Sequence, residues 1–355
     1  MNHRDSFDPM SPLHSPSRNE PAMQMRDGVV INGCIPQDEY SLFIFESLRS
    51  GATRFDTLWE SGEMPVLRCD DAFRRWRDEQ VRYHDHLRRN RITCTWPWQV
   101  LKFMDPAQRR STRLYWSQGR IGSCIGHADA FAHHSATLVA IACGAPLIYS
   151  PINPIVTWAM TKGGSLHGGQ TVADMARGAN RIGHFIEEMV GTDNQRMPAE
   201  WRRFETEAKQ YQSAILFLDF RSEQLVDEIF LCCRAGLAIA FGNSEAVRGV
   251  RVDRNGVRVA ELGGSWAHAT HFVAYRQIGT TEYIGWINSH GPIYTAGSEG
   301  EPADMCWMDR ATAMRFCESM PLYGAPYVVF PETPWREDES LRVTTRIPWP
   351  EHCVG

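Results

Sequence analysis

The sequence lacks the features that mark nucleic-acid-binding and membrane-spanning proteins. Its 355 residues carry 37 basic and 42 acidic side chains, a formal net charge of −5. This balance excludes a nucleic-acid binder that works through bulk positive charge. The most apolar stretch, residues 138–149, is interrupted by Gly144 and Pro146 and is shorter than the roughly 20 apolar residues of a transmembrane helix. We therefore predict no nucleic-acid partner and no membrane span.

Export signals and metal-binding cysteine patterns are missing as well. The first thirty residues contain charged side chains and no apolar run, which argues against a secretory signal and favours the cytoplasm. The ten cysteines are scattered without a C-x-x-C pair, so neither a zinc ribbon nor a disulfide framework is indicated. No cofactor and no metal are predicted.

What is present is typical of a globular protein with a substantial core. Hydrophobic residues make up 43% of the chain and charged residues 22%, and a chain of this length buries a core without disulfides. The predicted division is a flexible or partner-bound tail at 1–27, a helical extension at 28–95, the main domain at 96–335 and a C-terminal tail at 336–355. The extension contains an amphipathic helix predicted over residues 69–91.

The main domain changes character along its length. Its first half predicts helices over 123–142, 151–160 and 171–190, with Ser123 as the cap of a helix that begins at Cys124. The second half contains short β-prone runs at 214–220, 237–242, 250–259, 271–275, 283–287 and 327–330. Helices followed by strands predict the α+β class rather than a doubly wound sheet.

Cys124 follows the motif Gln118-Gly-Arg-Ile-Gly-Ser123. A thiol in the first turn of a helix is activated because the helix dipole and unpaired backbone N–H groups favour the thiolate. The side-chain amide of Gln118, together with the Cys124 N–H, is suited to an oxyanion hole. We predict Cys124 as a nucleophile and Gln118 as an oxyanion donor.

Two polar residues downstream are suited to support such a nucleophile. His268 opens a β-prone run and is a candidate base. After a hairpin predicted at 277–282, the next strand delivers Asn288, whose carboxamide is suited to orient the imidazole. Nucleophile, base and orienting residue thus occur in the order Cys, His, Asn.

At these residues the sequence resembles the papain-like (C1) cysteine peptidases. The family's Gln-Gly and Gly-Ser-Cys pattern is similar to residues 118–124, its His-Ala and following strand to 268–275, and its Asn-Ser-Trp-Gly to 288–291. His268 lies 144 residues after Cys124, within the family's separation of about 130–150 residues. The separation of 164 residues to Asn288 is slightly longer. The resemblance covers about residues 96–330.

The resemblance implies a papain-like fold, with a helical left lobe, a β-barrel-like right lobe and the site in the cleft between them. It implies a thiol peptidase or amidase that cleaves peptide bonds through a Cys124–His268–Asn288 triad and an acyl-enzyme, with a peptide or protein as substrate. The residues that it implies for substrate binding are Gly168, Gly169, Leu237 and Ala267. For Leu237 a plain core strand is an equal alternative. The family's disulfide is replaced by apolar Ile121 and Leu166, which agrees with a reducing compartment.

Two residues depart from the family pattern. The aromatic residue after the nucleophile is Ile125, and the tryptophan that shields the His–Asn bond is His290. Either change leaves the imidazole less protected unless another side chain covers it, for which Trp286 and Trp307 are the candidates.

Three alternatives remain open. The first is a structural or assembly protein, for example of a bacteriophage virion, which keeps the papain-like domain with little or no activity and binds assembly partners through residues 1–95. The second is acyl transfer to an amine by the same triad. The third is a metal shared by Cys124 and His127, for which the sequence specifies no further ligands, although His133 and His134 follow on the same helix.

Overall fold

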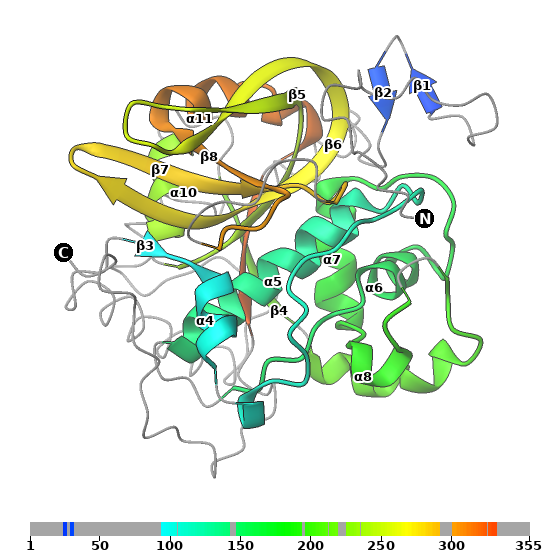
Figure 1. Ribbon diagram of the computed structural model, residues 1–355. Helices are drawn as coiled ribbons and strands as arrows, with labels where there is room; N and C mark the ends of the chain where they lie inside the picture. The colour runs from blue at the N-terminus through cyan, green and yellow to red at the C-terminus, as the bar shows by residue number, and fades with distance from the viewer. Residues whose placement is uncertain are drawn as a thin grey trace, which may run out of the picture.

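The structure is a computed structural model that describes residues 24–26, 29–31, 94–104, 106–142, 147–193, 196–211, 213–218, 225–234, 236–291, 300–324 and 326–331 (Figure 1). The predicted amphipathic helix at 69–91 and the predicted C-terminal tail lie outside these residues. So does most of the predicted N-terminal tail.

Helix α5 (Cys124–Ala142) is the central element of the fold. It begins at the residue that the sequence predicted, and the Ser123 carbonyl accepts the His127 N–H at 3.0 Å. Alanines recur along it, which favours helix formation and allows close packing. Figure 1 shows α5 between the strands and the other helices, and it contacts both groups.

The helical lobe packs against one side of α5. Its main helices are α4 (Pro97–Phe103), α6 (Pro154–Thr161), α7 (Val172–Ile182) and α8 (Glu187–Val190). The side chains of Asn153 and Thr171 cap α6 and α7 by accepting backbone N–H groups at 3.1 Å. Short helical segments follow at α9 (Glu205–Ala208) and in the 3₁₀ turns.

The predicted helix at 171–190 is two helices, because the chain turns at Gly183. This residue has φ of +81°, and a Cβ placed there would lie 1.8 Å from the Ala208 carbonyl oxygen. Only glycine fits such a close approach with a left-handed backbone. The sequence signal for the break was this single glycine.

The sheet lobe is built from long, curled strands. They are β4 (Ser213–Phe217), β5 (Ile239–Val252), β6 (Arg258–Ile278), β7 (Thr281–Ile287), β8 (Met305–Asp309) and β9 (Tyr327–Pro331). β7 pairs antiparallel with β6 and β8, and β8 pairs back with β6 at Val259 and Trp307. These three strands therefore close on one another, which gives the lobe its barrel-like form.

β5 and β6 are longer than the predicted runs. The glycine and polar residues at 242–244 indicated a break, but the ladder continues through register shifts between Asn243 and Gly249. β-bulges of this kind accommodate residues that do not suit a regular strand. The hairpin predicted at 277–282 is confirmed, with Ile278 paired to Thr281.

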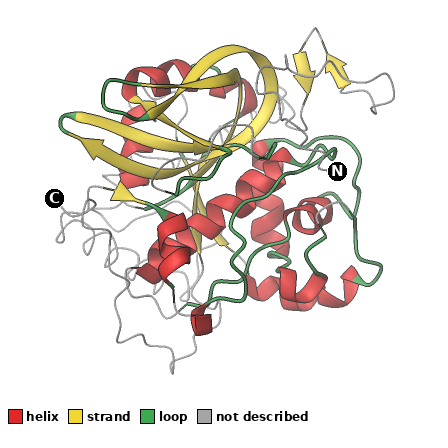
Figure 2. Cartoon of the chain, in the orientation of Figure 1, coloured by secondary structure: helices red, strands yellow, loops and turns green. Residues whose placement is uncertain are grey.

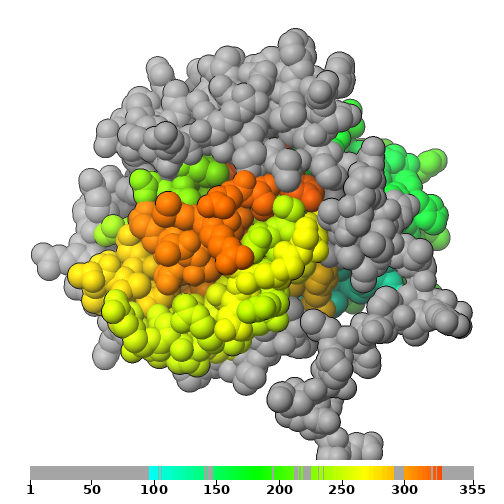
Figure 3. Space-filling model, turned by 90° about the horizontal axis from the view of Figure 1, so that it is seen from above, coloured from blue at the N-terminus to red at the C-terminus, as the bar shows by residue number. Residues whose placement is uncertain are grey.

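Two helices cover the sheet lobe, α10 (Leu225–Arg234) and α11 (Arg310–Cys317). The Asp309 side chain caps α11 by accepting the Thr312 N–H at 2.8 Å. Figure 3 shows this lobe from above, with the orange segment that contains α11 beside the yellow-green strands β5 and β6. Cys232 and Cys233 lie near the end of α10 and are fully buried.

Three short strands precede the main domain. β1 (Gln24–Arg26) pairs with β2 (Val29–Ile31), β2 pairs in parallel with β6, and β3 (Cys94–Thr95) pairs with β6. The partner of Ile31 is Ala267. Among the described residues ahead of α4, β2 and β3 thus pair with β6 of the same chain.

The α+β class and the division into a helical lobe and a barrel-like sheet lobe are confirmed (Figure 2). Cys124 at the start of α5 and His268 in β6 come from the two different lobes. Within the described residues, no helix has the length and apolar composition needed to cross a membrane.

Candidate active site

Cys124 is the first residue of α5 and is fully buried. Its Sγ accepts a hydrogen bond from the Ala269 N–H at 3.3 Å. The sulfur is thus held against the backbone of the residue that follows His268 in β6. A backbone N–H directed at sulfur, at a helix N-terminus, favours negative charge there.

His268 and Asn288 form a short hydrogen bond, with His268 Nε2 and Asn288 Oδ1 2.7 Å apart. The Ser289 N–H also donates to this Oδ1, at 2.7 Å, so this atom is the carbonyl oxygen of the amide. Because Oδ1 only accepts, Nε2 carries the ring proton. Nδ1 is then the basic nitrogen, and in the described residues no hydrogen-bond partner reaches it.

A bulge in the β5–β6 ladder shapes the strand at His268. Asn243 is the partner of His268, and the register shifts before the next pair, Glu245 with Ser265. The Asn243 side chain holds the bulge, since its Nδ2 donates to the Glu245 carbonyl at 2.9 Å and its Oδ1 accepts the Trp266 indole N–H at 3.3 Å. Bulges often re-aim side chains beside functional sites.

His290 and Trp266 cover the His268 ring. The His268 and His290 rings stack with centroids 4.2 Å apart and an interplanar angle of 23°. Trp266 lies on His268 with centroids 4.8 Å apart. His290 Nδ1 also lies 3.4 Å from Asn288 Nδ2. His290, which stands where the family has a tryptophan, therefore lies over the His268–Asn288 hydrogen bond itself.

The His268 ring is covered by Trp266 and His290 and not by the two tryptophans predicted from the sequence, Trp286 and Trp307. Trp286 donates its indole N–H to Thr270 and stacks on Trp266, one layer behind it. The buried apolar residues form two clusters, one that contains Cys124, Trp266 and Trp286 and one that contains Trp307. In the second cluster Trp307 packs with Trp96 and Trp98. The sequence offered Trp266 as a candidate only through its position two residues before His268, on the same strand face.

Gln118 is joined by two hydrogen bonds to Ser289, the residue after Asn288, and by a third to the loop before Cys124. Its backbone N–H donates to the Ser289 carbonyl at 2.7 Å, and its Oε1 accepts from the Ser289 hydroxyl at 2.6 Å. Its Nε2 donates to the Ile121 carbonyl at 3.0 Å, which orients the amide N–H₂ toward the loop before Cys124. Ser289 is thus a supporting residue that the sequence analysis did not single out.

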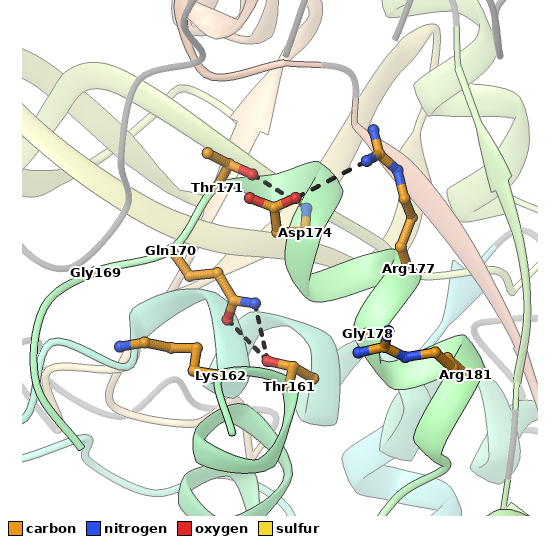
Figure 4. Close-up of a pocket in the computed structure, with 9 residues that line it drawn as sticks. All are labelled: Thr161, Lys162, Gly169, Gln170, Thr171, Asp174, Arg177, Gly178 and Arg181. Atoms are coloured by element: carbon orange, nitrogen blue, oxygen red, sulfur yellow. Dashed lines mark hydrogen bonds and ion pairs between the residues drawn. The ribbon is translucent and has the colours of Figure 1, made fainter. Parts of the chain in front are cut away.

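The glycine-rich loop follows α6 and reaches a pocket of about 600 Å³ that is lined by Gly169, Gln170 and basic side chains (Figure 4). Gly168 has φ of +72° and no atom within 4 Å of its missing Cβ. Lys162 donates to the carbonyls of His167 and Gly168 and lies over the Trp158 ring. Burial lowers the pKa of Lys162 to about 8.

Of the residues predicted for substrate binding, Ala267 lies beside His268 and faces Ile31 of β2 in register. Leu237 lies elsewhere. It is buried in the apolar core, directly after Gly236, whose Cα approaches Val139 so closely that a Cβ would lie 2.2 Å from it. Val139 is fifteen residues beyond Cys124 on α5, about 22 Å along the helix. The structure therefore does not bring Leu237 to Cys124, which fits the core-strand alternative.

The apolar replacements are accommodated by packing. Ile121 and Leu166 are partly buried against the apolar cluster that contains Cys124, and Ile125 is fully buried in it.

His127, considered with Cys124 as a metal pair, directs Nδ1 to the Ser123 carbonyl at 3.1 Å. His127 Nδ1 therefore donates a hydrogen bond to the backbone carbonyl just before α5.

Burial sets the charge state of the site histidines. It lowers the pKa of His268 well below its ordinary value of 6.5, the neighbouring His290 lowers it further, and the bond to Asn288 opposes these effects. Burial also lowers the pKa of His127 and of His290 to about 4. In the resting site these rings are neutral at neutral pH, which leaves His268 Nδ1 able to accept a proton.

Solved structures with a similar fold are cysteine proteases. The chain is similar to xylellain from Xylella fastidiosa, with 15% identity and a TM-score of 0.42 over 65% of this chain and 88% of that one. It is similar to digestive procathepsin L 3 of Tenebrio molitor larval midgut, with 13% identity and a TM-score of 0.41 over 81% of this chain and 90% of the other. It is also similar to procathepsin B S9 from Trypanosoma congolense, with 12% identity and a TM-score of 0.43 over 82% of this chain and 89% of the other.

No family model and no curated protein matches the chain.

Replacing His290 with alanine is expected to expose the His268–Asn288 bond to water. The stacked ring at 4.2 Å would be lost, while Trp266, whose ring lies 4.8 Å from that of His268, would remain. We expect solvent exchange of the His268 Nε2 proton to accelerate by at least tenfold, measured by NMR at neutral pH, because the covered bond becomes hydrated. The exposed His167→Ala is the control. An unchanged exchange rate in a folded His290→Ala protein would show that His290 is not the cover.

The buried histidines predict a protein that loses stability in mild acid. Burial lowers the pKa of His127 and His290 to about 4 and of His134 and His271 to about 3. The unfolded chain takes up these protons near pH 6.5, so it binds more protons than the folded chain. The free energy of unfolding should therefore fall from about pH 6.5 down to pH 4, by about 1.4 kcal/mol per pH unit for each ring.

Asp304 and Glu187 act in the opposite direction, because burial raises the pKa of both, that of Asp304 to about 6, but they are two groups against several. Urea unfolding at pH 7, 6 and 5 measures the net effect. Equal transition midpoints at pH 7 and pH 5 would contradict the prediction.

Proposed function

We propose that this chain is a papain-like thiol peptidase or amidase that uses Cys124, His268 and Asn288 as its triad. The observation that carries the proposal is the orientation of His268. Its Nε2–H is committed to Asn288 Oδ1 at 2.7 Å, and the Ala269 N–H that follows it holds Cys124 Sγ at 3.3 Å. These two bonds support the proposal, because one fixes the tautomer of the imidazole and the other holds the thiol against the backbone next to His268.

In the first half-reaction His268 Nδ1 takes the proton of the Cys124 thiol, and the Asn288 amide stabilises the imidazolium through Nε2–H. The thiolate attacks the carbonyl carbon of the scissile amide. The Cys124 backbone N–H and the Gln118 amide donate to the oxyanion that forms. The imidazolium then gives its proton to the leaving nitrogen, the C–N bond breaks, and a thioester on Cys124 remains.

In the second half-reaction His268 Nδ1 removes a proton from water, which attacks the thioester carbon. The tetrahedral intermediate collapses, the C–S bond breaks, and the acid product leaves while Cys124 recovers its proton. If an amine reached the thioester before water, the same chemistry would give acyl transfer. The described residues give no observation that favours this alternative over hydrolysis.

The substrate of this proposal is a peptide or protein strand. Gly168 and Gly169 offer backbone without side chains, and Ala267 offers a small residue beside the base. The pocket next to Gly169 is lined by Lys162, Arg177 and Arg181 and by one carboxylate, Asp174, which pairs with Arg177 at 3.9 Å (Figure 4). This positive balance favours a substrate with acidic side chains. Binding of assembly partners through residues 1–95 stays a prediction.

The test is intact-mass analysis after treatment with an epoxysuccinyl probe, which alkylates activated thiols. We expect a single adduct on the wild-type chain and none on Cys124→Ala or His268→Ala. Cys306→Ala is the matched control and should retain the adduct, because Cys306 is equally buried and its pKa is raised by burial. A folded wild-type chain without an adduct, or an adduct that persists in Cys124→Ala, would refute the proposal.

A further inference from the structure

A second cluster of polar side chains lies on α5, away from Cys124. Asp129, His133 and His184 place a carboxylate oxygen and two imidazole nitrogens within 4.8 Å of one another. All three residues are buried, with exposed fractions of 0–1%. Asp129 lies about 7.5 Å along the helix from Cys124 and on a different face, since each residue turns by about 100°. The cluster is therefore separate from the proposed triad.

The backbone after α7 fixes the position and the tautomer of His184. Gly183 turns the chain where no side chain would fit, and His184 follows directly. His184 Nδ1 lies 2.7 Å from the Tyr211 carbonyl oxygen, which only accepts, so Nδ1 carries a proton. Nε2 is then the nitrogen that faces the cluster. Histidines that bind metals are held in the same way, with the outer nitrogen donating to a carbonyl or carboxylate.

Asp129 is oriented in a similar manner. Its Oδ1 accepts from the Tyr327 hydroxyl at 2.8 Å, and its Oδ2 lies 3.0 Å from His184 Nε2. Within the described part of the chain, no lysine or arginine pairs with this carboxylate; its ion-pair partner is His184. A buried carboxylate needs compensating positive charge.

A proton on His184 would compensate Asp129, but it would involve only these two residues. The third, His133, follows Asp129 by one helical turn, so it projects from the same face. Its ring lies beside that of His184, with centroids 4.2 Å apart. A divalent cation would use all three groups, because zinc binds nitrogen and oxygen at about 2.0–2.2 Å with a tetrahedral geometry.

We propose that Asp129, His133 and His184 bind a zinc ion, or a first-row transition metal of similar preference, as a structural site. Tetrahedral coordination separates ligand atoms by about 3.3 Å, which is close to the 3.0 Å between Asp129 Oδ2 and His184 Nε2. The fourth position would be filled by water or another oxygen. The ion would join α5 to the segment after α7, and Tyr327 would tie it to β9.

The experiment is metal analysis of the folded full-length chain, in a Cys124→Ala background that removes the thiol as a competing ligand. The protein is produced with added zinc, treated with a weak chelator and analysed by mass spectrometry of the element. We expect about one zinc per chain, and less than about a tenth as much in His184→Ala and in Asp129→Ala. His134→Gln, a buried histidine of the same helix, and exposed His167→Ala should keep the metal.

A folded background protein without zinc would overturn the proposal, and so would zinc that persists in His184→Ala and Asp129→Ala. In case those variants do not fold, the second measurement uses the background chain refolded with cobalt. A tetrahedral site predicts absorption bands in the visible range and a thermal midpoint above that of the metal-free chain. Absence of both would also overturn the proposal.

Discussion

The proposed site depends on one contact between the lobes, the hydrogen bond from the Ala269 N–H in β6 to Cys124 Sγ at the start of α5. It lies where a helix N-terminus from one lobe meets a strand of the curled sheet from the other. The long β6 strand also carries Trp266 and His268, and its partner β7 leads to Asn288 and His290. Displacement of α5 against β6 would therefore separate the thiol from the base, although each lobe kept its own core.

Around this contact the site is assembled from neutral, buried groups rather than from ion pairs. His268 is covered by His290 and Trp266 and is oriented by Asn288. The same burial that keeps the imidazole unprotonated, and so free to accept the proton of a neighbouring thiol, makes protonation by bulk acid unfavourable for the folded chain. The chemistry and the acid sensitivity thus have one physical cause, which is the exclusion of water from the interface between the lobes.

The sequence predicted the parts of this site that depend on local signals. The start of α5 at Cys124, the hairpin at 277–282 and the strand that leads to Asn288 each follow from neighbouring residues. Features that arise from tertiary contacts were missed. The bulge held by Asn243 was interpreted as a strand break, and Trp266 was not recognised as a cover for His268. Leu237, predicted either for substrate binding or for a core strand, is buried in the apolar core. The Asp129–His184 contact joins residues 55 positions apart, which no periodicity reveals.

The central claim is that His268 activates Cys124. The most direct measurement is the rate at which iodoacetamide alkylates Cys124 at pH 6, followed by mass spectrometry of the peptide that contains it, in the wild-type chain and in His268→Ala. The account predicts a rate on the order of 100-fold lower in His268→Ala, because a positioned base contributes about that factor. Equal rates in two folded proteins would show that the thiol and the imidazole do not act together, and would contradict the account.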